Sequence, residues 1–213
     1  MCKGVINVKV LLVNGGPHQD GCTNRALKEV SKTLEENGIK TEIMWLGTKA
    51  ISGCIACNAC IKTGRCVIED KVNEFLEKVE ETDAFVFGSP VHFAAISGSL
   101  SSFMDRVFYG RGKLFENKVA AGVVSCRRGG ATAAFDEINK YFLMSNMIVV
   151  GSSYWNMVHG STKEQVEKDE EGLQTMRNLG NNIVWLLKSI EAGKEKGIKL
   201  PKREEPIKTN FIR

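Results

Sequence analysis

The sequence predicts an α/β fold in which a parallel β-sheet carries helices on both faces. Short apolar runs of strand length alternate along the chain with segments whose apolar residues recur at helical spacing. Glycine-rich or polar segments separate these runs, as expected where strands turn into helices. With 213 residues, 43% of them hydrophobic, the chain is long enough to bury a sizeable core. We therefore expect one domain with a layered α/β architecture.

The first half of the chain predicts two strands, each followed by helical sequence. The run VKVLLVNGG is apolar and ends in two glycines, and Asn24 to Asn37 then shows helical spacing through Leu27 and Leu34. The run IKTEIMWLG predicts the second strand. The segment after it is rich in Gly and Cys and predicts no definite element. A short helix is expected from Val72 to Val79.

The second half predicts three further strands. The run DAFVFGSP is a buried strand that stops at Gly88 and Pro90. A helical stripe at i, i+3, i+4, i+7 and i+8 follows it, formed by Leu100, Phe103, Met104, Val107 and Phe108. KVAAGVVS precedes a helix over Ala131 to Leu143. MIVVGSS is the fifth strand, and a long last helix is expected from Gly172 to Ile190.

Charge and hydropathy favour neither a membrane protein nor a nucleic-acid-binding protein. The longest apolar runs have the length of strands, and the N-terminus lacks the basic and apolar regions of a signal peptide. The formal net charge of +4 comes from interleaved Lys and Glu, with no basic block before the mixed tail KEKGIKLPKREEP. We expect a cytoplasmic protein with a C-terminal tail from about residue 193.

The loop NGGPHQDGCTN after the first strand is the first candidate site, because parallel α/β sheets bind ligands at the carboxyl ends of their strands. Gly15, Gly16 and Gly21 allow close backbone approach, and Thr23 and Asn24 stand where a helix offers free N–H groups. The alternative is an ordinary loop with Thr23 or Asn24 as helix cap. Neither a Walker lysine nor a G-x-G-x-x-G spacing is present, so a single phosphate is the better ligand.

Several segments, in this order, resemble one family. The chain is similar to the flavodoxin-like NAD(P)H-dependent FMN reductases, in particular their iron-sulfur flavoprotein branch, in GGPHQDGCTN, CIACNACIKTGRCVIED, GSPVHFAAISGSLSSFMDR, RRGG, YWNMVHG and the ending TNFIR. The resemblance covers essentially the whole chain. It implies a single flavodoxin-like FMN-binding domain over residues 1–213, with a doubly wound five-stranded parallel sheet of order 2-1-3-4-5. It also implies a homodimer or a tetramer of dimers.

The resemblance implies two groups of FMN-binding residues. It places the phosphate on Gly16, His18, Gly21, Cys22, Thr23 and Asn24. It places the isoalloxazine ring along Ser89, Pro90, Val91, His92 and Phe93, and the ring's other edge against Ser125, Arg127, Arg128, Gly129 and Gly130. Much of the wider family has Ser, Arg and Asn where this chain has Gly16, His18 and Cys22. Backbone N–H groups and Thr23 should therefore carry more of the phosphate binding.

Flavin chemistry requires little acid or base from the protein, so no catalytic residue is assigned. Hydride passes from a nicotinamide to flavin N5, and the protein supplies position and charge near N1. Arg127 and Arg128 are candidates for that positive edge, with surface arginines as the alternative. His92 and His159 are candidates for proton donors, with simple packing as the alternative.

Four of the seven cysteines lie in one segment, spaced C-x2-C-x2-C-x5-C. The tight triplet resembles loops that bind three corners of a [4Fe-4S] cluster, and Gly64 allows the chain to turn back for the fourth. The resemblance implies the cluster ligands Cys54, Cys57, Cys60 and Cys66. Zinc, which usually pairs two distant C-x2-C units, and unmetallated thiols are the alternatives. The segment follows the second strand, so we expect the cluster at the flavin end of the sheet. Cys2, Cys22 and Cys126 read as lone packing residues.

Two functions are predicted side by side. The first is an enzyme that takes electrons from NAD(P)H onto FMN and passes them to a small acceptor such as flavin or quinone. The second is an electron carrier whose [4Fe-4S] cluster exchanges electrons with a ferredoxin-like partner while FMN converts between one- and two-electron steps. A redox-sensing or structural protein would perform neither reaction.

Overall fold

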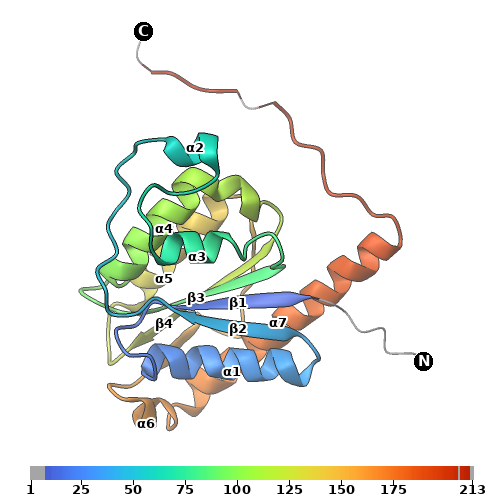
Figure 1. The fold of residues 1–213 in the computed structure, drawn as a ribbon. Helices are drawn as coiled ribbons and strands as arrows, with labels where there is room; N and C mark the ends of the chain where they lie inside the picture. Colours follow the sequence, from blue (N-terminus) through green and yellow to red (C-terminus); the bar gives the residue numbers. More distant parts are fainter. Residues whose placement is uncertain (1–7, 206, 212–213) are drawn as a thin grey trace.

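A parallel sheet forms the centre of the molecule (Figure 1). The computed structural model describes residues 8–205 and 207–211, so Cys2 lies outside the described residues. Among these residues the strands are β1 (Lys9–Asn14), β2 (Lys40–Trp45), β3 (Ala84–Pro90), β4 (Val119–Cys126), β5 (Ile148–Val149) and β6 (Met157–His159). The main path of the sheet is β2-β1-β3-β4-β5, which confirms the predicted order. Every strand pair is parallel.

The predicted fifth strand, MIVVGSS, forms only the two-residue strand β5, and a further short strand, β6, follows outside the predicted run. β5 pairs with the start of β4, and β6 pairs with its end, at Val124 to Cys126. Between them the buried side chain of Asn156 donates from Nδ2 to the Gly122 carbonyl at 3.0 Å, which satisfies a backbone acceptor that no strand residue reaches. The Ser152 hydroxyl donates a hydrogen bond of 2.6 Å to Asn156 Oδ1. Side-chain hydrogen bonds thus replace strand pairing across the gap.

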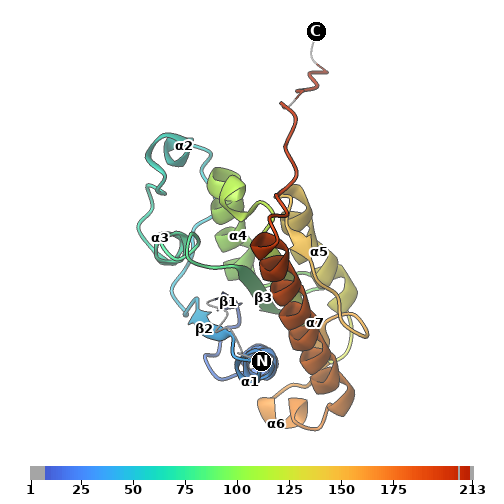
Figure 2. The same ribbon diagram turned by 90° about the vertical axis from the view of Figure 1, so that its right-hand side faces the viewer.

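Helices cover both faces of the sheet. They are α1 (Cys22–Glu36), α2 (Ala59–Thr63), α3 (Lys71–Leu76), α4 (Gly98–Arg111), the 3-10 turn η1 (Gly112–Phe115), α5 (Ala131–Met144), α6 (Lys163–Val166) and α7 (Glu170–Glu195). One buried cluster joins the sheet to α1 and α7, and the other joins it to α3, α4 and α5. Figure 2 shows α7 lying along the sheet on the side of α1.

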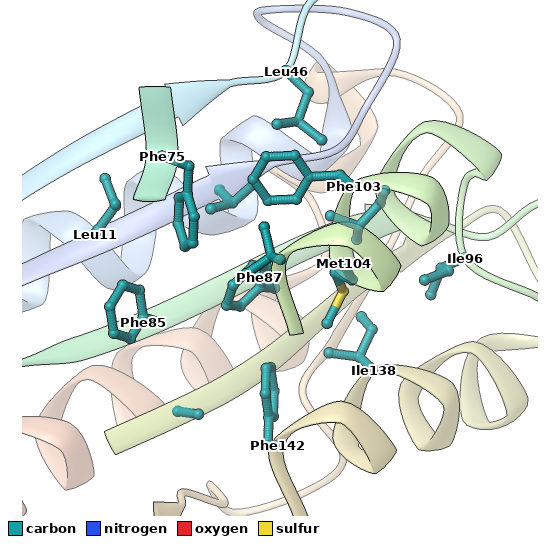
Figure 3. Close-up of a cluster of buried hydrophobic side chains, with 14 of the residues drawn as sticks. Leu11, Leu46, Phe75, Phe85, Phe87, Ile96, Phe103, Met104, Ile138 and Phe142 are labelled. Atoms are coloured by element: carbon teal, nitrogen blue, oxygen red, sulfur yellow. The ribbon is translucent and has the colours of Figure 1, made fainter. Parts of the chain in front are cut away.

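An aromatic core lies beneath α3, α4 and α5 (Figure 3). Phe75 of α3 meets Phe103 of α4 edge to face, with ring centroids 5.2 Å apart, and Phe85 and Phe87 rise toward them from β3. Such pairs add about 0.5–1.5 kcal/mol beyond burial. This core fixes α4 rigidly on the sheet, which matters because α4 contacts both candidate sites.

Helix ends differ from the predicted ends where a side-chain cap decides them. α7 begins at Glu170, two residues before the predicted start, because Asp169 Oδ1 accepts from the Gly172 amide at 3.0 Å. The short helix α3 begins after Asp70, whose Oδ1 accepts from the Val72 amide at 3.0 Å. α7 ends at Glu195, and the described residues after it have no regular secondary structure. None of the helices in the described ranges is long and apolar enough to cross a membrane.

Candidate functional site

A cleft of about 190 Å³ opens at the carboxyl ends of β1, β3 and β4. The loops after these three strands and after β6 line it. Nine of the predicted FMN-binding residues meet there: Gly16, His18, Gly21, Cys22, Thr23, Pro90, Val91, Ser125 and Arg127. The loops after β1, β3 and β4 thus bring these nine residues into one cleft.

A hydroxyl pair joins two of these loops inside the cleft. Thr23 Oγ1 lies 2.9 Å from Ser125 Oγ, and both residues are buried. Each hydroxyl can donate one hydrogen bond, so one proton of the pair is available to a bound acceptor. A Cβ on Gly16 would stand 3.2 Å from Thr23 Oγ1 and 3.0 Å from Asn14 Oδ1. The loop is thus closed tightly over Thr23, and glycine at position 16 permits that approach.

The N-terminus of α1 borders the cleft and has no side-chain cap. Gly21 is the N-cap, and neither a capping side chain nor an acidic residue occupies the first turn. The alternative in which Thr23 or Asn24 caps the helix is therefore wrong. α3, α4, α6 and α7 have a capping side chain, provided by Asp70, Ser97, Thr162 and Asp169, whereas α2 and α5, like α1, have none. An uncapped N-terminus of a 15-residue helix favours an anion.

Two residues that the sequence analysis missed hold the first loop in shape. Asn14, fully buried at the end of β1, accepts from the Gly16 amide at 2.9 Å and donates to the His18 and Gln19 carbonyls. Trp45 at the end of β2 donates from Nε1 to the Gly16 carbonyl at 2.8 Å. The sequence signal for the role of Asn14 is its position: it is a polar residue that ends an otherwise apolar strand and directly precedes two glycines.

The predicted ring-binding loop forms a tight turn at the rim. His92 and Ala95 exchange backbone hydrogen bonds of 2.9 Å, and Phe93 (φ 51°) and Ala94 (φ 62°) adopt left-handed conformations between them. His92 and Phe93 are exposed, and Phe93 makes almost no contact with its own chain, at 106% exposure. Strained turns of this kind persist where surrounding structure fixes them. The turn is therefore a rim element rather than a wall of the cleft.

Glycine packing fixes this turn against the loop after β4. Gly130 has a left-handed φ of +86°, and a Cβ there would lie 2.8 Å from Ala94 Cα. Arg127, Arg128 and Gly129 are exposed, and of these three only Arg127 lines the cleft. The remaining predicted residues lie outside its lining: Asn24, Ser89, His92, Phe93, Arg128, Gly129 and Gly130.

Ser89 is fully buried next to the cleft and does not line it. Its hydroxyl donates to the Pro90 carbonyl at 2.8 Å and accepts from the Ser97 amide at 2.9 Å. Ser97 in turn donates from Oγ to the Gly15 carbonyl at 2.7 Å. Ser89 thus couples the start of α4 to the first loop, and its contacts are structural.

The loop after β6 completes the cleft with Gly160 and Ser161. Neither residue is among the predicted FMN-binding residues, although Gly160 ends the family-like segment YWNMVHG. Cys22 donates from Sγ to the Gly160 carbonyl at 3.6 Å, and burial raises the pKa of its thiol. His159 itself is exposed, with Nδ1 3.6 Å from Asp169 Oδ2. It does not line the cleft.

The clustered cysteines form a second site. All four line one small cavity of about 20 Å³ together with Arg106 and Tyr109 of α4: Cys54, Cys57, Cys60 and Cys66. They are free thiols. Gly64 has a φ of +76°, which confirms that the chain turns back there. In the described residues, no group of three His, Cys, Asp or Glu side chains is arranged to hold a metal ion.

Three residues of α4 contact the cysteine loop. Arg106 Nη2 donates to Cys66 Sγ at 3.2 Å, and Tyr109 Oη lies 3.3 Å from Asn58 Oδ1. A Cβ on Gly110 would lie 2.3 Å from Cys60 Sγ, so any larger residue would displace the Cys60 side chain. Buried Asn73 pairs with both backbone groups of Cys66, at 2.9 and 3.0 Å. Long-range packing on α4 therefore shapes a loop that has no buried core of its own.

The cysteine site and the cleft lie at different places along α4. Ser97 at the helix start bonds the cleft loop, whereas Tyr109 and Gly110 at the helix end meet the cysteines. Twelve residues of helix separate Gly98 from Gly110, which amounts to about 18 Å at 1.5 Å per residue. Figure 1 shows the loop leaving β2 and rising to α2, away from α1. The expectation that both sites share one end of the sheet is therefore wrong within a single chain.

The sheet order and the cleft define the chain as a flavodoxin-like α/β protein. Residues 8–162 match the NADPH-dependent FMN reductase family. The chain belongs to this family, in its iron-sulfur flavoprotein branch, and membership makes it a flavoprotein of the oxidoreductase class.

Similar proteins support this assignment along the chain. An iron-sulfur flavoprotein of Methanocaldococcus jannaschii is 36% identical over 192 residues, covering 86% of this chain and 100% of the relative. One from Methanosarcina thermophila is 26% identical, covering 89% and 100%. RosB with a bound riboflavin-phosphate intermediate has a TM-score of 0.65 at 16% identity, with 97% and 92% coverage. An archaeal flavodoxin has a TM-score of 0.58 at 15% identity, with 85% and 99% coverage. The two structures show the fold alone.

Proposed function

We propose that this protein is an FMN-dependent oxidoreductase that moves electrons from NAD(P)H through bound FMN to a small acceptor such as flavin or quinone. The observation that carries the proposal is the uncapped N-terminus of α1, which faces a cleft with a buried hydroxyl pair. FMN supplies hydride acceptance and one- or two-electron release. The family match supports FMN as the cofactor.

In this proposal the chain's own residues bind and orient the cofactor. The amides from Gly21 to Asn24 and the Thr23 hydroxyl hold the phosphate, which replaces the missing helix cap. Pro90 and Val91 border the ring, and Arg127 places positive charge at its edge. Arg128 and His92, both exposed at the rim, are available to the incoming nicotinamide or acceptor.

A second candidate function is an electron carrier with a [4Fe-4S] cluster on Cys54, Cys57, Cys60 and Cys66, exchanging electrons with a ferredoxin-like partner. The four thiols that line one cavity support it, as do the relatives named iron-sulfur flavoproteins. A cluster spreads its thiolates over four irons, so its ligands stand farther apart than those of a single ion. The compact C-x2-C-x2-C spacing favours a cluster over zinc, which usually pairs two distant C-x2-C units.

We further propose a cytoplasmic homodimer or tetramer. Clustered free thiols are typical of a reducing compartment. Exposed large apolar side chains on α5, α7 and the loop before β6 suit contacts between subunits: Leu143, Met144, Tyr154, Trp155 and Trp185.

Anaerobic stopped-flow spectroscopy separates the two functions. Rapid bleaching of the flavin absorption by NADPH or NADH alone supports the reductase. Bleaching only by a reduced ferredoxin supports the carrier. Failure of the purified protein to bind FMN contradicts both.

A further inference from the structure

Arg106 is the most deeply buried guanidinium at the cysteine site. Its side chain is 1% exposed, although it belongs to α4 and not to the cysteine loop. Forty residues separate it from Cys66 in the sequence. An arginine buried to this degree needs charge partners or acceptors for its nitrogens, since desolvation of a lone cation is costly.

The guanidinium contacts both ends of the cysteine loop. Nη1 donates to the Ser52 carbonyl at 3.4 Å, before the first cysteine. Nη2 donates to the Ile68 carbonyl at 2.8 Å and to Asp70 Oδ1 at 3.0 Å, after the last cysteine. One planar group therefore closes the whole segment from 52 to 70, which a lysine with its single nitrogen cannot do.

The same guanidinium contacts a thiol directly. Nη2 lies 3.2 Å from Cys66 Sγ, and within the described residues the buried Nε has no hydrogen-bond partner. A buried donor without a partner favours an additional acceptor at the site. Thiolates and inorganic sulfides of a cluster are such acceptors, and hydrogen bonds to cluster sulfurs are one of the factors that set reduction potentials.

We propose that Arg106 is the positioning residue of the cysteine site: it holds Cys66 in place as a ligand and raises the reduction potential of the bound cluster through an N–H···S hydrogen bond. Reduction adds negative charge to the cluster, so a hydrogen bond donated to its sulfur stabilises the reduced state more than the oxidised state. Asp70 pairs with both Nη atoms and offsets the charge of the guanidinium, so the effect comes from the hydrogen bond. The inference rests on the proposed cluster function. It concerns a residue outside the cysteine motif.

The test compares Arg106→Met, Arg106→Lys and the control Arg65→Met. Arg65 adjoins Cys66 but is half exposed and pairs with Glu69 and Glu77 on the surface. In reconstituted protein we expect Arg106→Met to lower the one-electron equilibrium constant for cluster reduction at least tenfold, equal to about 59 mV, in an electron paramagnetic resonance titration. Iron release to a chelator should accelerate, whereas Arg65→Met should match the wild type in both measurements.

A second readout needs no cluster. In iron-free protein, hydrogen–deuterium exchange of residues 66–70 should accelerate in Arg106→Met and Arg106→Lys but not in Arg65→Met. If Arg106→Met loses FMN binding, and so its fold, Arg106→Lys decides. The proposal is overturned if Arg106→Lys has the same hydrogen–deuterium exchange rates at residues 66–70 and the same cluster reduction potential as the wild type. Wild-type protein that takes up no iron or sulfide refutes the cluster function, while exchange still tests the positioning role of Arg106.

Discussion

Thr23 is the single side chain on which phosphate binding depends most in the proposed site. Its hydroxyl is buried against Ser125 at 2.9 Å, at the first turn of α1. We expect Thr23→Val to weaken FMN binding by about 1–3 kcal/mol, because a charged acceptor loses a hydrogen-bond donor. Fluorescence titration of apoprotein with FMN measures the effect.

Thr33→Val is the matched control for that change. Thr33 lies on the same helix, is equally buried, and donates to the Glu29 carbonyl at 3.0 Å, far along α1 from the cleft. The Thr33→Val substitution should leave the affinity for FMN unchanged. Riboflavin lacks the phosphate, so the wild type should bind it more weakly than FMN. The affinity for riboflavin should be the same in Thr23→Val as in the wild type. Equal wild-type affinity for the two flavins contradicts phosphate recognition at this helix.

At the level of elements, Glu29 links α1 to α7. Its carboxylate accepts from Arg177 Nη1 at 2.6 Å and from Arg25 Nη1 at 2.8 Å. Burial alone would raise the pKa of Glu29, but the hydrogen bonds from Arg177 and Arg25 outweigh it and hold that pKa below its ordinary value. The folded state therefore binds this proton less readily than the unfolded state. The link stabilises the fold above the ordinary glutamate pKa and is lost as pH falls through the lowered value.

Glu29→Gln should accordingly lower the free energy of unfolding by about 1–2 kcal/mol at neutral pH, since both partners are only partly buried. The difference from the wild type should shrink as pH falls through the lowered pKa of Glu29, where the wild-type carboxylate also becomes protonated. Urea denaturation at several pH values measures it. Glu36→Gln, on the exposed end of α1, is the control. A difference that does not change with pH would mean that charge plays no part in this link.

α4 carries the contact that the cysteine loop tolerates least. Gly110→Ala would place a Cβ 2.3 Å from Cys60 Sγ, so we expect the loop to shift and iron uptake on reconstitution to fall severalfold. Alanine favours helix by about 1 kcal/mol over glycine, so overall stability should change little. Gly98→Ala at the other end of α4 has open space and should retain full iron content. Iron analysis with parallel FMN titration distinguishes loop damage from unfolding.

Local patterns predicted the helices and strands well, because apolar periodicity reports the face that each element buries. The apolar stripe at residues 100–108 is the face that α4 buries in the core of the structure. The same logic predicted the glycine loop at the cleft. It could not predict the split edge strand, which depends on Asn156 reaching Gly122, nor Arg106 and Gly110, whose cysteine contacts join distant segments. Such contacts leave no periodic trace in the sequence.

At the scale of the whole molecule, the cleft and the cysteine site are built from separate loops that share only α4. The sheet supplies the cleft through the ends of β1, β3 and β4, and its two cores do not require the cysteine segment, since Cys66 is the only one of the four cysteines packed against them within the described residues. Damage to one site should therefore leave the other functional. This independence is testable because each proposed cofactor has its own absorption.

Cys60→Ala removes the last ligand of the cysteine triplet and should abolish the broad iron-sulfur absorption of anaerobically reconstituted protein while FMN affinity stays within twofold of the wild type. The reason is that Cys60 contacts α4 at Gly110, about 18 Å along the helix from the residue that adjoins the cleft. Cys22→Ala, inside the cleft lining, should leave the iron-sulfur absorption intact. Loss of both FMN and iron in Cys60→Ala would show that the two sites fold as one unit. Wild-type protein that binds FMN but neither iron nor acid-labile sulfide would leave the NAD(P)H-dependent reductase as the function and the four thiols unmetallated.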